Sequence, residues 1–185
     1  MHGAPEASGW VRRWSSLCRP GARVLDVACG SGRHVRWLAG HGFTVTGVDR
    51  DAAAVEPLRG LAEIVVADIE NGPWPFGGRL FDLVLVTHYL WRPRLPDIVA
   101  AVAPGGALVY ETFAVGNETV GKPSRPDFLL RPGELLHAVG ELRVIAYEDG
   151  FLDGPPRFIQ RIAAVRPAAA SATPDRFALD PPAAR

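Results

Sequence analysis

The segment VLDVACGSGRH, residues 24–34, carries one acid within an apolar run and then two glycines. The apolar run predicts a buried strand over 22–28, and Gly30 and Gly32 predict a tight turn into a helix that ends near His41. Glycines let the backbone pass close to a ligand, and the first turn of a helix offers free N–H groups. Taken alone, such a turn fits a packing role as well as a binding role.

Apolar runs and helical patterns alternate along most of the chain, with Gly- and Pro-containing turns between them. This alternation predicts an α/β, doubly wound (Rossmann-like) parallel sheet with right-handed crossovers and helices on both faces. The predicted strands are 22–28, 43–49, 63–67, 81–87 and 107–113, and the predicted helices are 9–18, 33–41, 51–60 and 95–103.

The C-terminal part follows another pattern. A short helix is predicted at 134–139, and strands are predicted at 141–148 and 157–166. The link between these two strands, 149–156, is too short to contain a crossover helix, so they are expected to pair antiparallel. The prediction is therefore a seven-stranded sheet with five parallel strands plus a C-terminal antiparallel pair.

Three segments are expected along the chain. Residues 1–21 form an N-terminal segment with one helix, and residues 22–166 form a single domain. Residues 167–185 are rich in Ala and Pro and poor in large apolar side chains, which predicts a disordered tail.

Three acids end successive predicted strands: Asp26, Asp49 and Asp68. Parallel strands of a doubly wound sheet end at one edge, so these carboxylates should converge on one crevice. Asp49 follows Gly30 by about 20 residues, the spacing at which a carboxylate can accept both ribose hydroxyls. Asp68 is placed where it could accept an adenine amino group.

With these features, residues 22–166 resemble the class I S-adenosylmethionine-dependent methyltransferases. The resemblance predicts that 22–166 is a methyltransferase domain. It is carried by five segments: VLDVACGSG, VTGVDRD, VVADIENGPWPF, FDLVLVTHYLW and VAPGGALVYETF.

The resemblance implies a set of residues that bind S-adenosylmethionine. In that family the first acid and the glycine turn hold the methionine end, the second acid holds the ribose, and the segment after the third strand holds adenine. Arg50 could cover one adenine face with its planar side chain. The segment that begins at Thr87 lies where the family places the transferring methyl group. The cofactor-binding residues implied are Asp26, Gly30, Gly32, Asp49, Arg50, Asp68, Ile69 and Thr87.

A looser resemblance concerns the segments after the fourth and fifth strands, which are similar to those of tellurite-resistance and thiopurine-type methyltransferases. It implies a small, polarizable acceptor, such as a thiol or a metalloid oxyanion.

A nicotinamide-dependent dehydrogenase is the nearest alternative of the same architecture. Its fingerprint needs a third small residue, and that position holds Val35. Asp26 would repel a pyrophosphate, whereas it would attract a cationic sulfonium cofactor with an ammonium group. Charge and pattern both favour the methyltransferase.

The segment after the fourth strand holds the catalytic candidates. His88 is either a base or a group that orients the acceptor, and the alternative is a histidine packed beside the cofactor. Tyr89 either orients the acceptor or lines the cofactor pocket. Trp91 is a candidate wall of the substrate pocket.

Two further residues are candidates for the substrate pocket. Trp10 either caps the pocket or buries the N-terminal helix. Glu111, which ends the fifth strand near the site, either accepts a proton or pairs with Arg92 or Arg94. The long loop 114–131 lacks periodicity, which is typical of lids or of disorder.

Composition narrows the function further. The chain has 185 residues, 20 basic and 20 acidic residues and a formal net charge of +0, without the basic excess typical of proteins that bind nucleic acid. Two cysteines and scattered histidines predict no disulfide framework and no metal site. No signal peptide or membrane span is evident, so a cytoplasmic protein with a small-molecule substrate is expected. The alternatives are a non-catalytic cofactor-binding module and a methyltransferase of protein or RNA.

Overall fold

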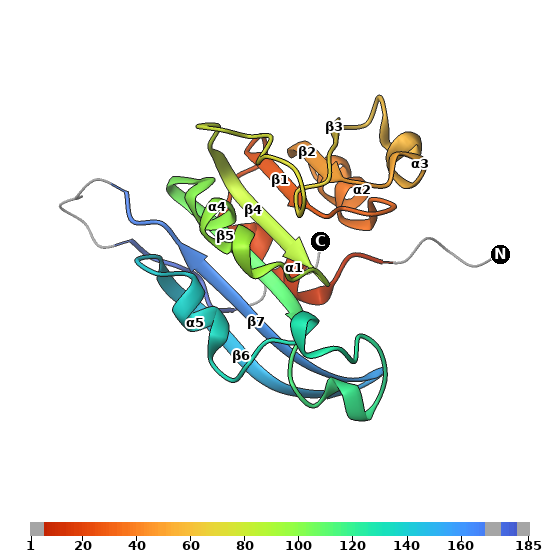
Figure 1. Cartoon of the computed structure of the whole chain (residues 1–185). Coiled ribbons are helices and arrows are strands. Elements are labelled where there is room, and N and C mark those ends of the chain that lie inside the picture. Colours follow the sequence, from red (N-terminus) through yellow and green to blue (C-terminus); the bar gives the residue numbers. More distant parts are fainter. Residues whose placement is uncertain (1–5, 169–174, 181–185) are drawn as a thin grey trace.

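The computed structural model describes residues 6–168 and 175–180. Seven strands form one sheet in the order β3-β2-β1-β4-β5-β7-β6 (Figure 1). Their bounds are β1 Arg23–Val27, β2 Thr44–Asp49, β3 Glu63–Val66, β4 Phe81–Thr87, β5 Val102–Phe113, β6 Arg143–Asp153 and β7 Pro156–Val165.

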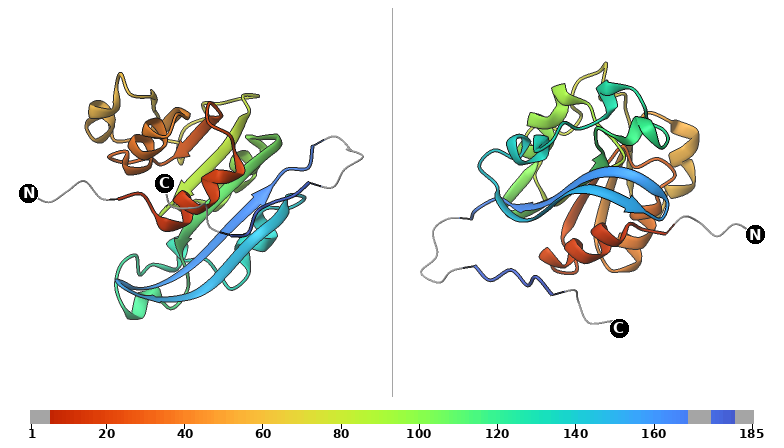
Figure 2. Two further views of the ribbon diagram at one scale, coloured as in Figure 1. Left: turned by 180° about the vertical axis from the view of Figure 1, so that it is seen from behind. Right: turned by 90° about the horizontal axis from the view of Figure 1, so that it is seen from below.

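Helices cover both faces of the sheet, as predicted. α4 and α5 lie on one face, and α1 crosses the other, where α2 also lies (Figures 1 and 2). The α-helices are α1 Gly9–Trp14, α2 Arg33–Gly40, α3 Ala52–Val55, α4 Leu95–Ala100 and α5 Glu134–Ala138; the 3-10 helices are η1 Ser15–Leu17, η2 Glu56–Leu58, η3 Arg92–Arg94, η4 Asn117–Thr119 and η5 Pro126–Phe128.

The strand directions confirm the predicted topology. β1 to β5 are parallel to their neighbours, and β7 runs antiparallel to both β5 and β6. From β1 the chain winds outward through β2 to β3, then returns to β4 beside β1 and winds the other way. The crevice at the carboxyl ends of β1 and β4 is therefore the switch point where such sheets bind ligands.

Each face of the sheet has its own hydrophobic core, because neighbouring residues of a strand point to opposite sides. On β4, Val84 and Val86 pack with α4 and α5, whereas Leu83 and Leu85 pack with α1 and α2. All four are fully buried. Burial on both faces explains why the central strands read as continuous apolar runs.

Three element boundaries differ from the predictions. The helix predicted at 51–60 stops after one turn and continues as η2, where Pro57 lacks the N–H that an α-helix needs. The helix predicted at 95–103 ends at Ala100, and β5 begins at Val102, which pairs with Phe81. The loop predicted at 149–156 is largely strand, since β6 and β7 extend into a tight hairpin.

The terminal segments are partly described. α1 adds Trp10, Val11 and Trp14 to the core on its face of the sheet. Of the tail predicted to be disordered, 169–174 and 181–185 lie outside the described residues, and 175–180 contains neither helix nor strand. No helix among residues 6–168 and 175–180 combines the length and the apolar character that crossing a bilayer requires.

Candidate functional site

The glycine turn after β1 opens onto the crevice. Ala28, Gly30 and Gly32 all have a positive φ, at 54°, 52° and 77°. A Cβ added at Gly30 would meet no atom within 4 Å, so this position faces open space. A Cβ at Gly32 would overlap the side chain of Leu58. Gly30 thus leaves room for a ligand to approach the backbone, and Gly32 allows η2 to pack against the turn.

Asp26 lies at the base of the crevice and is 1% exposed. Neither of its carboxylate oxygens has a hydrogen-bond partner among the described residues. Burial raises the pKa of Asp26 to about 8; the charge of Asp49 adds to the rise, whereas that of Arg33 opposes it. A buried carboxyl without a partner is costly, and a cationic ligand group would supply the missing partner.

Asp49 and Asp68 are each held by backbone N–H groups. Asp49 accepts from the N–H of Gly30 at 2.8 Å and from that of Asp51 at 2.9 Å, which fixes the acid against the glycine turn. Asp68 accepts from the side-chain amide of Asn71 at 2.9 Å and from backbone N–H groups. The bond from Asn71 is the main reason that the pKa of Asp68 is lowered. Both acids are therefore oriented, with lone pairs left for a ligand.

A pocket lies beside these acids at the carboxyl ends of β1, β2 and β3. Four of the residues predicted to bind the cofactor lie in its walls: Asp49 and Arg50 at the end of β2, and Asp68 and Ile69 after β3. Its walls are Ala28, Val48, Asp49, Arg50, Ala67, Asp68, Ile69, Glu70 and Tyr89. Arg50 lies 3.9 Å from the carboxylate of Glu70 at this pocket. We call it the nucleoside pocket, after the ligand group that the sequence predicts there.

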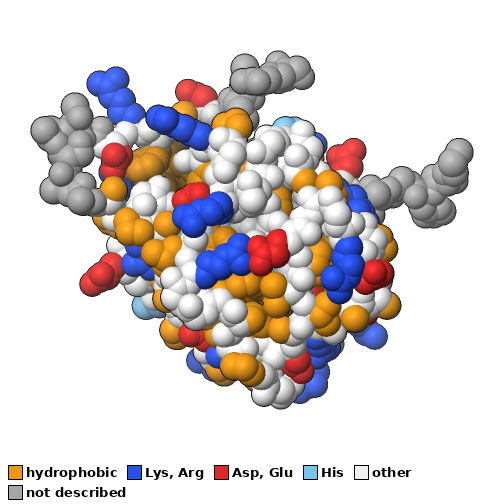
Figure 3. Space-filling view, turned by 90° about the horizontal axis from the view of Figure 1, so that it is seen from above, with side chains coloured by type: hydrophobic (Ala, Val, Ile, Leu, Met, Phe, Trp, Pro, Cys, Tyr) orange, Lys and Arg blue, Asp and Glu red, His pale blue; other side chains and the backbone are white. Residues whose placement is uncertain are grey.

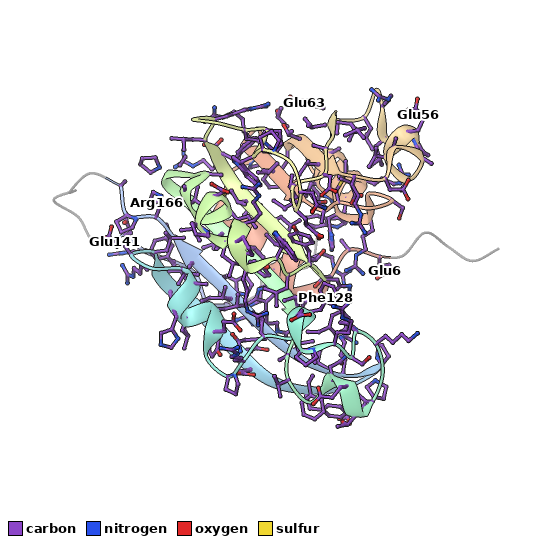
Figure 4. All side chains as sticks on the ribbon, in the orientation of Figure 1. Glu6, Glu56, Glu63, Phe128, Glu141 and Arg166 are labelled. Atoms are coloured by element: carbon purple, nitrogen blue, oxygen red, sulfur yellow. The ribbon has the colours of Figure 1, made fainter. Side chains whose placement is uncertain are left out.

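A second pocket adjoins it and shares Glu70 and Tyr89 with it. We call it the acceptor pocket, after the methyl acceptor that the sequence predicts near His88 and Tyr89. It is lined by Glu70, His88, Tyr89, Leu90, Thr112, Phe113, Pro123 and Phe128. In Figure 4 the labelled Phe128 lies near the ends of β4 and β5. Both catalytic candidates, His88 and Tyr89, line the acceptor pocket.

His88 is held firmly at the end of β4. Its φ is +53°, and its backbone N–H donates to the carbonyl of Glu111 at 2.9 Å. Its ring lies 4.9 Å from that of Phe113, and Nδ1 lies 3.4 Å from a guanidinium nitrogen of Arg33. Burial and the charge of Arg33 lower the pKa of His88. A guanidinium can only donate, so Nδ1 accepts and the neutral ring carries its proton on Nε2.

Tyr89 stands between the two pockets. Its hydroxyl oxygen is buried without a hydrogen-bond partner among the described residues. Burial raises its pKa, so the hydroxyl remains protonated at neutral pH. The geometry supports the lining role and leaves the hydroxyl available to a ligand.

The structure places Trp10 and Trp91 outside both pockets. Trp10 is 3% exposed, donates from its indole to the carbonyl of Ile162 at 3.3 Å and lies beneath the guanidinium of Arg161. It buries α1 against the sheet, on the face away from the acceptor pocket. Trp91 precedes η3 and lies outside both pockets.

Glu111 is not paired with Arg92 or Arg94. Its carboxylate accepts from the hydroxyl of Ser8 at 2.8 Å and pairs with Arg161 at 3.1 Å. The antiparallel register places Arg161 directly opposite Glu111. Arg92 and Arg94 instead pair with Glu134 and Asp97. Glu111 therefore has a structural partner and lies outside the acceptor pocket.

Thr87 also lies outside both pockets. Its hydroxyl is 3.3 Å from Nδ1 of His34, and Nε2 of His34 accepts from the N–H of Ser8 at 3.2 Å. Burial lowers the pKa of His34 to about 3, so this ring is neutral. Thr87 thus joins α2 to β4 through His34, a contact that the sequence did not predict.

Several residues of the site were missed by sequence reasoning. Glu70, Phe113 and Phe128 line the acceptor pocket, and Arg33 contacts His88. Only Arg33 had a usable signal, as the first residue of the helix after the glycine turn. Among the described residues, no three His, Cys, Asp or Glu side chains are grouped so that they could hold a metal ion.

Known proteins share this architecture. Residues 24–106 match the family described as "Methyltransferase domain". A tRNA U34 carboxymethyltransferase of Alcanivorax borkumensis is 30% identical over 174 residues, covering 82% of this chain and 53% of that protein. A thiopurine S-methyltransferase of Pseudomonas syringae pv. pisi is 50% identical over 44 residues, covering 23% of this chain and 20% of that protein.

Solved structures show the same fold. TehB from Haemophilus influenzae superposes with a TM-score of 0.72 at 19% identity, covering 89% of this chain and 64% of that one. A TehB-like SAM-dependent methyltransferase from Corynebacterium glutamicum superposes with a TM-score of 0.64 at 21% identity, covering 85% of this chain and 87% of that one. The chain spans about half or less of the length of the curated relatives named above.

Proposed function

Because this chain belongs to the class I S-adenosylmethionine-dependent methyltransferases, we propose that it transfers a methyl group from S-adenosylmethionine to a small-molecule acceptor. The observation that carries the proposal is the buried carboxyl of Asp26, which lacks a partner among the described residues and lies in a strand at the switch point of the sheet. S-adenosylmethionine supplies an electrophilic methyl group on a cationic sulfur, together with an ammonium group that suits Asp26.

The residues of the crevice divide between the two ends of this cofactor. Asp49 and Asp68 present oriented carboxylates to the nucleoside pocket, where they would accept from ribose hydroxyls and the adenine amino group. Arg50 borders the same pocket. Arg33 forms no ion pair within 4.0 Å with a carboxylate of the described residues, so its guanidinium can bind the carboxylate of the amino-acid end.

The chain's main catalytic task is to align the acceptor and exclude water. The acceptor pocket meets the nucleoside pocket at Glu70 and Tyr89, so the methyl group would be transferred near these residues. His88 offers a donor at Nε2 and would orient the acceptor. It could take up a proton at Nδ1 only after Arg33 turns away, for instance toward the cofactor carboxylate.

A small acceptor is favoured over nucleic acid by charge. On the face drawn in Figure 3, Lys and Arg side chains lie scattered among apolar ones, and several stand beside acidic ones. The chain as a whole has 20 basic and 20 acidic residues. Nucleic-acid binding usually needs a concentrated basic surface to neutralise phosphates. The apolar walls of the acceptor pocket, Leu90, Phe113 and Phe128, also suit a small molecule.

The direct test is methyl transfer from labelled S-adenosylmethionine to a panel of thiols, phenols, amines and selenium and tellurium oxyanions. Transfer to at least one is expected. Cofactor binding without transfer to any of them would favour a non-catalytic module or a macromolecular acceptor. The same assay with tRNA as the acceptor separates these two explanations, because only a macromolecular methyltransferase could label it.

Calorimetry tests the cofactor site independently. Asp49→Ala should weaken S-adenosylhomocysteine binding by about 1–3 kcal/mol, because ribose hydroxyls would lose their acceptor. Asp82→Ala is the matched control, since Asp82 lies at the start of β4 and binds Arg23 at the opposite edge of the sheet. Equal affinities of the two variants would contradict the ribose assignment.

A further inference from the structure

We propose that the acceptor is a planar aromatic molecule whose ring carries no anionic substituent apart from the accepting atom. This inference rests on the proposed function and names its substrate class. It follows from the walls of the acceptor pocket, from how they are held, and from their charge.

The walls are mostly aromatic and aliphatic. Phe113 and Phe128 come from β5 and η5, and Leu90 and Pro123 complete the apolar lining. The ring of His88 lies 4.9 Å from that of Phe113 at an interplanar angle of 34°. Aromatic side chains bind flat rings through large contact areas and favourable ring-to-ring geometry. A compact, strongly hydrated ion would gain little from such walls.

The loop that supplies Phe128 is anchored on both sides. Arg92 donates to the carbonyls of Asp127 at 2.8 Å and Leu129 at 2.9 Å, and it also pairs with Glu134 at 2.6 Å. Phe128 is therefore held between two fixed peptide groups. A wall that is already in place loses little conformational entropy when a ring binds against it.

A second anchor holds the other end of the loop. The buried side chain of Asn117 donates to the carbonyl of Pro123 at 3.0 Å and accepts from the N–H of Phe158 on β7 at 3.2 Å. Ala114 and Leu130 form an isolated parallel bridge that closes the loop. The pocket is thus formed before an acceptor arrives.

The charge of the pocket disfavours anions. Among the described residues, its lining contains one carboxylate, Glu70, and neutral His88, but no Lys or Arg. Arg33, which contacts His88, is the cation assigned above to the carboxylate of the cofactor. Arg125 lies over the ring of Phe128 at 5.4 Å but is paired with Asp127 at 3.1 Å. Binding a selenium or tellurium oxyanion here would remove its hydration without supplying a cation. The proposal therefore favours an aromatic acceptor over the oxyanion alternative raised from the sequence.

The junction of the two pockets orients the ring. Tyr89 lines both pockets and its hydroxyl lacks a partner among the described residues, so it can donate to the accepting atom while the rest of the ring lies against Phe113 and Phe128. For an aromatic thiol, a sulfur lone pair forms the new bond to the methyl carbon. The bond from that carbon to the cofactor sulfur breaks with its electron pair staying on the cofactor. The thiol proton has already passed to solvent, because the thiolate is the nucleophile.

The test compares an uncharged aromatic thiol with acceptors that carry an extra negative charge, lack the aromatic ring, or both. The rates are measured with 4-methylthiophenol, 4-mercaptobenzoate, 2-mercaptoethanol and selenite. We expect kcat/KM for 4-methylthiophenol to exceed that for each of the others by about tenfold or more. Equal or faster methylation of selenite or 2-mercaptoethanol would overturn the proposal. Equal rates with 4-mercaptobenzoate would refute the charge argument.

Substitutions of Phe128 in the wall of the acceptor pocket provide a second test, measured by kcat/KM and by cofactor affinity. Phe128→Ala should lower kcat/KM for 4-methylthiophenol by about tenfold, and Phe128→Leu by less, since it keeps apolar volume without a ring. Phe128 lies outside the nucleoside pocket, so S-adenosylhomocysteine affinity should stay within about twofold. Phe151→Ala, in the exposed hairpin between β6 and β7, is the matched control and should change neither quantity.

The outcomes separate this inference from the proposed function. If Phe128→Ala retains its melting temperature and its kcat/KM, the aromatic wall is not used and the inference is wrong. If the wild-type protein does not bind S-adenosylhomocysteine at all, the proposed function itself is wrong. Binding of 4-methylthiophenol to the protein loaded with S-adenosylhomocysteine, followed by calorimetry, checks the pocket without turnover.

Discussion

Replacing Asp26 with Asn should stabilise the ligand-free protein at alkaline pH while it weakens cofactor binding. Asp26 is 1% exposed and has no partner for either oxygen among the described residues. Ionising this carboxyl inside the fold is therefore unfavourable, and burial raises its pKa from 3.8 to about 8. Asn has nearly the same shape and cannot ionise.

The sign of the pH dependence follows from this raised pKa. In the unfolded chain the carboxyl ionises near pH 4, whereas in the folded protein it stays protonated until about pH 8. The contribution to stability is complete below about pH 4 and is lost as the pH rises to 8. About four pH units at about 1.4 kcal/mol each correspond to a loss on the order of 5 kcal/mol.

Urea unfolding of the wild type and of Asp26→Asn, near pH 4 and at pH 8.5, measures this loss. Near pH 4 the two free energies of unfolding should nearly agree, because a neutral carboxyl and an amide have similar burial costs. At pH 8.5 the variant should be more stable by several kcal/mol. A variant that is less stable at pH 8.5, or a difference that does not change with pH, would show that ionising Asp26 does not destabilise the fold.

The same pKa predicts proton release when the cofactor binds. At pH 7 a group with a pKa of about 8 is about 0.9 protonated. An ammonium group beside Asp26 favours its charged form, so binding should release close to one proton per site. Calorimetry in buffers of different ionisation enthalpy counts these protons. Binding without release would mean that Asp26 does not meet the cationic group.

Three further predictions concern the turn and the acceptor pocket. Gly32→Ala should destabilise the protein by about 1–3 kcal/mol, because the new Cβ would overlap the side chain of Leu58 at a residue with a positive φ. Gly30→Ala should instead lower cofactor affinity more than the melting temperature, because Gly30 faces open space. A larger loss of stability in Gly30→Ala than in Gly32→Ala would contradict these roles. The kcat/KM of the wild type should fall as the pH drops through the pKa of His88, below its ordinary value of 6.5, and His88→Gln should lack this fall in a pH–rate profile. Arg92→Leu should raise KM for the acceptor by about tenfold with little change in cofactor affinity, and an unchanged KM would show that the loop does not depend on this anchor.

Most of the fold could be predicted because its strands are short apolar runs separated by strong turn residues. The residues 81–87 show this best, since the predicted and observed strands coincide. The nucleoside pocket could also be predicted, because parallel strands end at one edge and carry Asp49 and Asp68 there. Local sequence patterns are enough to predict both the strands and the acids that follow them.

The acceptor side could not be predicted in the same way. Phe128 lies in a loop without periodicity, and its position depends on Arg92, a contact between residues far apart in the sequence. The partner of Glu111 depends on the register between β5 and β7, which a single sequence does not reveal. Trp10 fits an amphipathic helix whether or not that helix borders a pocket. Such features are determined by tertiary packing.

The most direct measurement is a crystal structure of the protein with S-adenosylhomocysteine. We expect adenosine in the pocket lined by Asp49, Asp68 and Ile69, with the amino group of the ligand against the carboxylate of Asp26. A ligand bound elsewhere, or an Asp26 side chain that still lacks a partner in the complex, would contradict this expectation.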